Sequence, residues 1–191
     1  MKKTLLYLLA IISISCKTNN NVDVNDYPIV TTIQTVAEYY DLKVDLSGKY
    51  ETTSTTRYFD GSTGLEYTYE LLETEEYDPL YYSITIEKEV SEKDARQLFL
   101  MGKGAINLIG KAYEQESKEI TTIELPGDES FYAYRTVEDE IIGMYYIIRK
   151  GKCVYTMAIN GVYTEDHSLV TDLLNPKIEN LEEFEIKKSE G

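Results

Sequence analysis

Short segments of β-forming residues, each closed by a turn, follow one another through most of the sequence from residue 49 onward. In the clearest segment, Leu65, Tyr67, Tyr69 and Leu71 alternate with polar residues, which is typical of a strand with one buried side. The threonine-rich run 49–59 precedes it across a glycine-containing loop, so the two segments predict a hairpin. Further strands are expected at 80–87, 119–125, 131–137, 141–149 and 153–159.

One long helix interrupts this series of strands. Ser91 followed three residues later by Asp94 is a helix-capping pattern, and a single apolar stripe then runs from Ala95 to Tyr113 at helical spacing. Gly102 lies on the apolar stripe, where the absence of a side chain indicates close approach of the helix to a sheet.

Three other segments carry weaker patterns. A short helix is expected to begin at Thr164 and to end before Pro176, because proline disfavours helical backbone in the preceding residue. The apolar residues of 178–186 predict a last edge strand. Segment 29–47 combines helical spacing with strand alternation and stays open between the two.

The order of these elements defines the expected fold class. It is α+β, with a single antiparallel β-sheet and with one long and one short helix packed mainly on one face. Residues 29–188 are expected to form one domain, since roughly 160 residues can enclose a single core.

The first fifteen residues have the three parts of a secretory signal. Lys2 and Lys3 are followed by roughly a dozen mostly apolar residues and then by small residues before Cys16. A membrane-spanning helix needs about 20 apolar residues, so this run predicts a cleaved signal peptide at 1–15 rather than a permanent span.

The junction Ser13-Ile14-Ser15-Cys16 resembles the lipobox of bacterial lipoproteins, in which a small residue precedes an obligatory cysteine. The resemblance implies cleavage before Cys16 and lipidation of its thiol and amine, so the partner implied is the membrane, reached through the lipid on Cys16. Several acyl chains on one residue make a durable anchor. Residues 16–28 are then expected to be the lipidated cysteine and a flexible tether.

Some lipoproteins carry acidic residues directly after the cysteine, which direct them to the cell surface. Here Lys17 and the asparagines at 19–21 occupy those places. The resemblance therefore implies a lipid-anchored protein of the cell envelope that faces the periplasm.

From residue 80 to 186 the element order resembles PsbP/DcrB-like domains. The similar stretches are the helix opening at 91–95, the end of the antiparallel meander at 151–157 and the helix start at 164–166. The resemblance implies a single antiparallel sheet flanked by helices, used as a non-enzymatic assembly or binding module. No ligand residue is carried over from it.

Charge and residue inventory exclude several kinds of function. The net charge of −15 repels phosphate backbones, so nucleic acid is excluded as a partner. His167 is the only histidine and is expected to be a solvated helix residue, while Cys153 is expected to be a buried thiol without a disulfide partner. These two residues cannot form a usual zinc site. We therefore predict no catalytic residues, no metal ligands, no cofactor and no enzyme activity.

Eighteen tyrosines with no tryptophan suit strands that are packed on one side, and they also suit a recognition surface. The leading hypothesis is an envelope lipoprotein that binds another envelope protein through a tyrosine-rich sheet face, as an assembly or accessory factor. The second is a module that binds a small ligand or an ion such as calcium. The third is a hydrolase that uses two close carboxylates.

Overall fold

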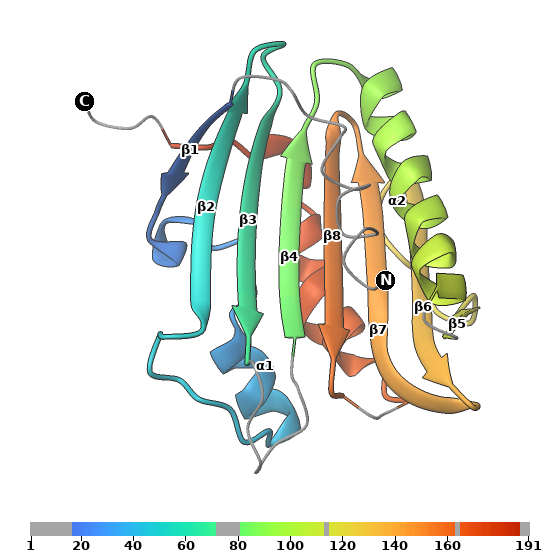
Figure 1. The fold of residues 1–191 in the computed structure, drawn as a ribbon. Helices are drawn as coiled ribbons and strands as arrows, with labels where there is room; N and C mark the ends of the chain where they lie inside the picture. The colour runs from blue at the N-terminus through green and yellow to red at the C-terminus, as the bar shows by residue number, and fades with distance from the viewer. Residues whose placement is uncertain (1–16, 72–80, 113–114, 163–164, 188–191) are drawn as a thin grey trace, which may run out of the picture.

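Eight antiparallel strands form one open sheet in the computed structural model, which describes residues 17–71, 81–112, 115–162 and 165–187 (Figure 1). The strand order is β1-β2-β3-β4-β8-β7-β6-β5, so two four-stranded meanders join along the β4–β8 pair. The predicted α+β class with a single antiparallel sheet is confirmed. The strands are β1 (Lys17–Asn21), β2 (Glu51–Tyr58), β3 (Thr63–Glu70), β4 (Tyr81–Lys88), β5 (Glu116–Glu119), β6 (Glu129–Val137), β7 (Glu140–Lys150) and β8 (Cys153–Asn160).

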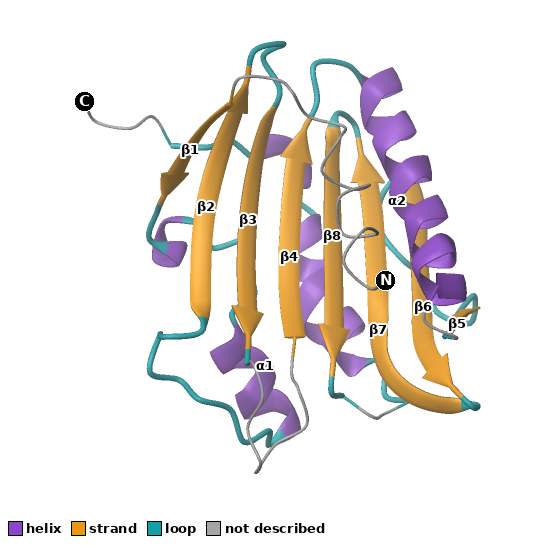
Figure 2. Ribbon diagram, in the orientation of Figure 1, coloured by secondary structure: helices purple, strands orange, loops and turns teal. Residues whose placement is uncertain are grey.

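The helices divide between the two faces of the sheet. The long helix α2 lies over β6 and β7 on one face, while the other helical segments lie behind the sheet (Figure 2). The expected placement of the long and the short helix on one face is therefore wrong, because α2 and the C-terminal helical segments pack on opposite faces. The helical segments are η1 (Val24–Asp26), α1 (Ile33–Tyr40), α2 (Glu92–Ala112), η2 (Leu169–Leu174, a π-helix), α3 (Asn175–Ile178) and η3 (Leu181–Glu183).

The division follows from the sheet alternation, because the strands next to α2 are apolar on both sides. On β6, Phe131 and Ala133 pack towards α2, while Tyr132 and Tyr134 point to the opposite face. A strand buried on both faces reads as a continuous apolar run, whose pattern does not say which helix covers which side. The sequence pattern alone therefore could not predict which helix covers which face of the sheet.

The larger core lies behind the sheet and is built on tyrosine. Seven buried tyrosines project from the strands into this core, where the shorter helical segments cover them. They are Tyr67 and Tyr69 of β3, Tyr82 of β4, Tyr132 and Tyr134 of β6, Tyr146 of β7 and Tyr155 of β8. Their rings meet edge to face at centroid distances near 6 Å, a favoured aromatic geometry.

The hydroxyls of these tyrosines hold the irregular segments in place. Tyr67 accepts the Ile33 amide proton at 2.9 Å, at the start of α1, and Tyr82 donates to the Thr31 carbonyl at 2.8 Å. Tyr146 donates to Asn175 Oδ1 at 2.7 Å, where α3 begins. A buried hydroxyl favours a hydrogen-bond partner, so Tyr67, Tyr82 and Tyr146 each connect a strand to a loop or helix start.

The smaller core lies between α2 and the strands beneath it. Ser91 caps the helix, its Oγ accepting the Asp94 amide proton at 3.2 Å, which confirms the predicted start. A Cβ on Gly102 would lie 3.3 Å from Ile147 Cδ1, so the expected close approach to the sheet is also confirmed. The core residues are Ala95, Phe99 and Ile106 of α2 with Phe131, Ala133, Ile147 and Val154 of the sheet.

Residues 17–28 differ from the flexible tether expected for them. Lys17 to Asn21 form β1, which pairs antiparallel with β2 from Lys17↔Tyr58 to Asn21↔Ser54. Tyr27 is buried, and its hydroxyl accepts the Lys187 amide proton at 3.2 Å. Asparagine is depleted in strands, so its run reads as a linker, but an edge strand needs only backbone hydrogen bonds to its single neighbour.

The C-terminal region also differs from expectation. The helical segment does not stop before Pro176 but continues from η2 into α3, with Pro176 in its first turn, where a proline needs no amide hydrogen bond. Segment 178–186 is not an edge strand: it contains η3 and then packs Phe184 and Ile186 onto the tyrosine core.

Two further segments resolve or correct the sequence patterns. Within 29–47, α1 forms over Ile33–Tyr40 with Thr32 as its N-cap, and residues 42–46 form no strand. The strand expected at 119–125 is instead β5 at Glu116–Glu119. The Ile120 amide still donates to the Tyr132 carbonyl of β6, and Ile120, Ile123 and Leu125 pack against the larger core outside the strand.

The tyrosine hydroxyls give a paired test of this architecture. Tyr82→Phe removes the hydrogen bond to the buried Thr31 carbonyl, so we expect the free energy of unfolding to fall by about 1–3 kcal/mol. Tyr155→Phe is the matched control, because the buried Tyr155 hydroxyl has no hydrogen-bond partner among the described residues and its removal should leave stability equal or higher. Urea unfolding of both variants measures the difference, and equal losses would contradict this role for the Tyr82 hydroxyl.

Candidate binding surface

Half of the α2-side face of the sheet is not covered by any helix in the described residues. Helix α2 crosses the β5–β8 half, whereas no helix lies in front of β1–β4 (Figure 1). We call the uncovered part the open face. Its side chains come from the positions that alternate with the buried core of each strand, namely Thr52, Ser54, Thr56 and Tyr58 of β2, Glu66, Thr68 and Glu70 of β3, and Tyr81, Ser83, Thr85 and Glu87 of β4.

Hydroxyl side chains run across the open face in register. Thr52 lies opposite Thr68, and Thr68 lies opposite Ser83 on the next strand. One step along the strands, Ser54, Glu66 and Thr85 form a second row, which continues into Thr156 of β8. These short hydroxyls make a low surface with many hydrogen-bond donors and acceptors.

A carboxyl group stands beside a glycine at one end of the open face, where β4 ends and β3 begins. Glu87 of β4 pairs with Gly64 of β3, and its Cγ lies 3.8 Å from where a Cβ on Gly64 would be. Burial, with the charges of Glu89 and Glu66 adding to it, raises the pKa of Glu87 to about 7. The group therefore changes charge near neutral pH, where an ordinary glutamate stays ionised.

Tyrosines border the hydroxyl rows. Tyr58 lies on β2 near Gly64, and burial together with the charge of Glu87 raises its pKa. On the α2 side the half-buried Tyr145 of β7 stands beneath the Arg135 guanidinium, 5.6 Å from ring centroid to Cζ. Aromatic rings, hydroxyls and a titrating carboxyl are together suited to bind a polar partner surface.

The expectation of a tyrosine-rich contact face holds only in small part. Most strand tyrosines lie in the core behind the sheet, and Tyr58, Tyr81 and Tyr145 are the ones on the α2-side face among the described strands. The strand interpretation of the tyrosine content is thus the one that the burial supports.

His167 is not the solvated helix residue that was expected. It precedes η2, is half-buried, and stacks on Tyr134 with a ring-centroid distance of 5.8 Å. Its Nδ1 lies 3.0 Å from the Tyr134 hydroxyl, which itself donates to the Glu165 carbonyl at 2.7 Å. The hydroxyl proton is therefore used, so Nδ1 carries a proton towards Tyr134. These contacts attach the segment before η2 to β6.

Cys153 lies at the start of β8 and is buried, as the sequence predicted. Burial raises the pKa of the Cys153 thiol to about 11. The thiolate, which is the nucleophilic and metal-binding form, is therefore disfavoured at neutral pH.

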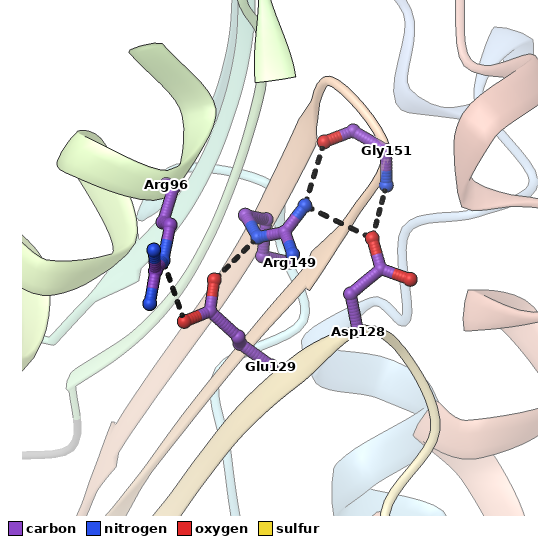
Figure 3. Close-up of polar contacts among 5 residues, drawn as sticks. All are labelled: Arg96, Asp128, Glu129, Arg149 and Gly151. Atoms are coloured by element: carbon purple, nitrogen blue, oxygen red, sulfur yellow. Dashed lines mark hydrogen bonds and ion pairs between the residues drawn. The ribbon is translucent and has the colours of Figure 1, made fainter. Parts of the chain in front are cut away.

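A network of four charged side chains joins the start of β6 to α2 and to the β7–β8 turn (Figure 3). Arg149 donates to Glu129 at 2.6 Å and to Asp128 at 2.9 Å, and Arg96 of α2 donates to the other oxygen of Glu129 at 3.1 Å. Burial alone would raise the pKa of Glu129, but the two arginines hold it below its usual value. Because the charges are paired, we interpret the network as a structural link between these elements rather than as a reactive site.

A partly open pocket of about 310 Å³ lies away from the open face, between η1 and the C-terminal segment. Its lining includes Tyr27, Ile29, Lys177 and Phe184. The Lys177 ammonium donates to the Val30 carbonyl at 2.7 Å, and burial lowers the pKa of this lysine. The pocket lies at the small end of the range for ligand sites.

Three further features bear on the sequence analysis: the lipidation site, membrane-spanning helices and clusters of metal-binding side chains. Cys16, the predicted lipidation site, and the signal segment 1–15 lie outside the described residues. Within the described ranges, no helix is long and apolar enough to cross a membrane. In the same ranges, no three histidine, cysteine, aspartate or glutamate side chains gather closely enough to hold a metal ion.

Comparisons of the chain with protein-family models, with curated proteins and with solved structures give no match.

The sequence contained part of the signal for the open face. Alternation around Ile84 and Ile86 places Ser83, Thr85 and Glu87 together on the other side of β4. The opposition of Glu87 to Gly64, however, depends on the strand register, which a single-strand pattern does not give.

The raised pKa of Glu87 predicts a pH-dependent stability. Folding favours the protonated carboxyl, so its stabilising contribution is complete below about pH 4.5 and is lost as pH rises to about 7. We expect Glu87→Gln, which stays neutral, to raise the melting temperature above that of the wild type at pH 8 and to leave it nearly unchanged at pH 4.

The matched control for this prediction is Glu70→Gln at the exposed end of β3. We expect this variant to keep the wild-type difference between pH 4 and pH 8. Thermal melts followed by circular dichroism measure all three proteins. A Glu87→Gln melting temperature that falls with pH as the wild-type value does would contradict the assignment.

Proposed function

We propose that this chain is a lipoprotein of the bacterial cell envelope, anchored through Cys16 and facing the periplasm, whose domain binds another envelope protein. It works as a non-enzymatic assembly or accessory module, and the open face of the sheet is its contact surface. The observation that carries the binding role is the half-uncovered sheet face with Glu87 at one end of it.

The anchor is supported by the sequence of the first sixteen residues, in which a basic start and a short apolar run lead to the lipobox-like junction before Cys16.

The contact role of the open face is supported by the position of Glu87, whose ionisation lowers the stability of the folded protein. A partly buried carboxyl with a raised pKa costs stability at neutral pH, and such groups gather at functional sites. A donor or counter-charge from a partner would repay the cost by stabilising the ionised form. The neighbouring hydroxyl rows offer further hydrogen bonds to the same partner.

Neither alternative function has comparable support. A small ligand would use the pocket beside Tyr27, which lies apart from the open face and its titrating carboxyl. A hydrolase would need a second carboxyl with a defined role beside Glu87, and the exposed Glu66 on the neighbouring strand lies on a sheet surface rather than in a pocket.

The anchor is tested by following the lipid. We expect cells fed with an alkyne-bearing fatty acid to label the wild-type protein, and mass spectrometry to place diacylglycerol on Cys16. Cys16→Ala should abolish the label and release the protein from membranes. Cys153→Ala is the matched control and should keep the label, since the Cys153 thiol is buried. A labelled Cys16→Ala protein would contradict the anchor.

The binding role is tested by photo-cross-linking in cells. A photoreactive amino acid at Thr68 or Thr85, both on the open face, is expected to capture the same envelope protein. The same probe at Asn107, exposed on the outer side of α2, is the control and should not capture it.

A disrupting variant makes the cross-linking decisive. Thr68→Arg places a large charged side chain in the middle of the hydroxyl rows and should abolish capture from Thr85 without unfolding the domain. Capture that is equal from Asn107, or that survives Thr68→Arg, would remove the open face as the contact surface.

A further inference from the structure

We propose that one end of the strands, where β1 begins and β2 ends, lies directly against the bilayer, with Phe59 and Val90 in contact with lipid. We call this end of the sheet the membrane edge. This inference rests on the proposed anchoring through Cys16. It goes further by naming the surface that meets the membrane and by orienting the domain on it.

The first step is the position of the anchor. Lys17, the residue after Cys16, already belongs to β1 and pairs with Tyr58, the last residue of β2. Consecutive Cα atoms are 3.8 Å apart, so no linker separates Cys16 from the sheet. A lipid on Cys16 therefore enters the bilayer beside the end of β2 rather than at the end of a long tether.

The second step is what the same edge exposes. The chain leaves β2 directly into Phe59, whose side chain is 80% exposed and is the most exposed large apolar residue among those described. Across the turn, Gly61 approaches Val90, with 3.7 Å between an ideal Cβ and Val90 Cγ1, and Val90 is 43% exposed. Two exposed apolar residues, Phe59 in the β2–β3 turn and Val90 after β4, are thus found at the end of the sheet where β1 begins.

The third step concerns the charged side chains at this edge, several of which form hydrogen bonds or ion pairs within the protein. The Asp60 carboxylate accepts hydrogen bonds from the Ser62 amide at 2.9 Å and from its hydroxyl at 2.7 Å. Lys88 forms an ion pair with Glu185, and Lys150 donates to the Glu179 carbonyl at 2.6 Å.

This end of the sheet also carries two negative and two positive side chains near the end of β4, the start of α2 and the β7–β8 turn, namely Glu89, Glu92, Lys93 and Lys152. The exposed Phe59 thus shares this end with charges of both signs, a composition suited to the interface between head groups and acyl chains.

The remaining exposed apolar residues lie elsewhere on the molecule, which allows a controlled test. Leu108 is 69% exposed, but it follows Glu92, the first residue of α2, by sixteen residues. At 1.5 Å per residue this places it roughly 24 Å along the helix from the proposed membrane edge. Leu46 lies before β2 begins, at the opposite edge of the sheet.

The experiment uses the absence of tryptophan from the chain. Phe59→Trp and Leu108→Trp each introduce a single reporter at an exposed position, and circular dichroism checks that both proteins fold. Each full-length acylated protein is reconstituted into vesicles of phosphatidylethanolamine and phosphatidylglycerol, with and without brominated acyl chains. We expect Trp emission from the Phe59→Trp protein to shift to the blue and to lose most of its intensity in brominated vesicles. Emission from the Leu108→Trp protein should be unchanged.

The outcomes separate this inference from the proposed anchor. Mass spectrometry of the purified proteins first shows whether Cys16 is acylated; an unmodified cysteine overturns the anchor and the inference with it. With Cys16 acylated, absence of quenching at Phe59 means that the domain stands off the bilayer, and the inference is wrong while the anchor stands. Quenching at Leu108, alone or together with Phe59, means that α2 lies on the membrane and equally overturns the orientation.

Discussion

The buried tyrosine layer is the interaction on which the rest of this structure depends. A leucine in the same place would fill the core, but only tyrosine can pack a strand face and also bond a polar group beyond it. Tyr67 and Tyr82 position the residues around the start of α1, while Tyr146 positions the start of α3. These segments are short and irregular, so they contribute few hydrogen bonds of their own. The strands thus determine the sheet, and the tyrosine hydroxyls determine how the remaining chain lies across its back.

This use of tyrosine decides where function can reside. The face that carries most of the aromatic side chains is committed to the core, which leaves the open face, the sheet edges and the outer side of α2 for contacts. On the open face, the unusual feature is not apolar area but a carboxyl group whose pKa is raised to about 7 beside a glycine. A polar, half-uncovered sheet face is in itself ordinary for an antiparallel sheet. Glu87, whose ionised form is disfavoured by burial, distinguishes this face from an ordinary solvent-exposed sheet face.

Much of the fold could be predicted from the sequence, because its strands alternate and its long helix has both a cap and a stripe. The failures have a common physical cause. Lys17 to Asn21 form a strand through backbone pairing alone, which side-chain propensity does not report. Phe184 and Ile186 are apolar because they cover tyrosines, not because they alternate in a sheet. The pairing of Glu87 with Gly64 could not be predicted for another reason: these residues meet through strand register, and register is a property of two strands rather than of one.

The strand assignment of residues 17–21 changes what the anchor would do. A flexible tether of twelve residues has a root-mean-square length of roughly 20 Å, so a domain on such a tether would present every surface to the membrane in turn. With β1 starting at Lys17, the freedom of the domain is reduced to rotation about the anchor, and the strands stand away from the bilayer when Phe59 meets it. The open face is then held upright beside the membrane, accessible from the side to a partner in the same envelope. In this proposal, the orientation of the open face would follow from the backbone pairing of five polar residues, without any specific lipid contact by the open face itself.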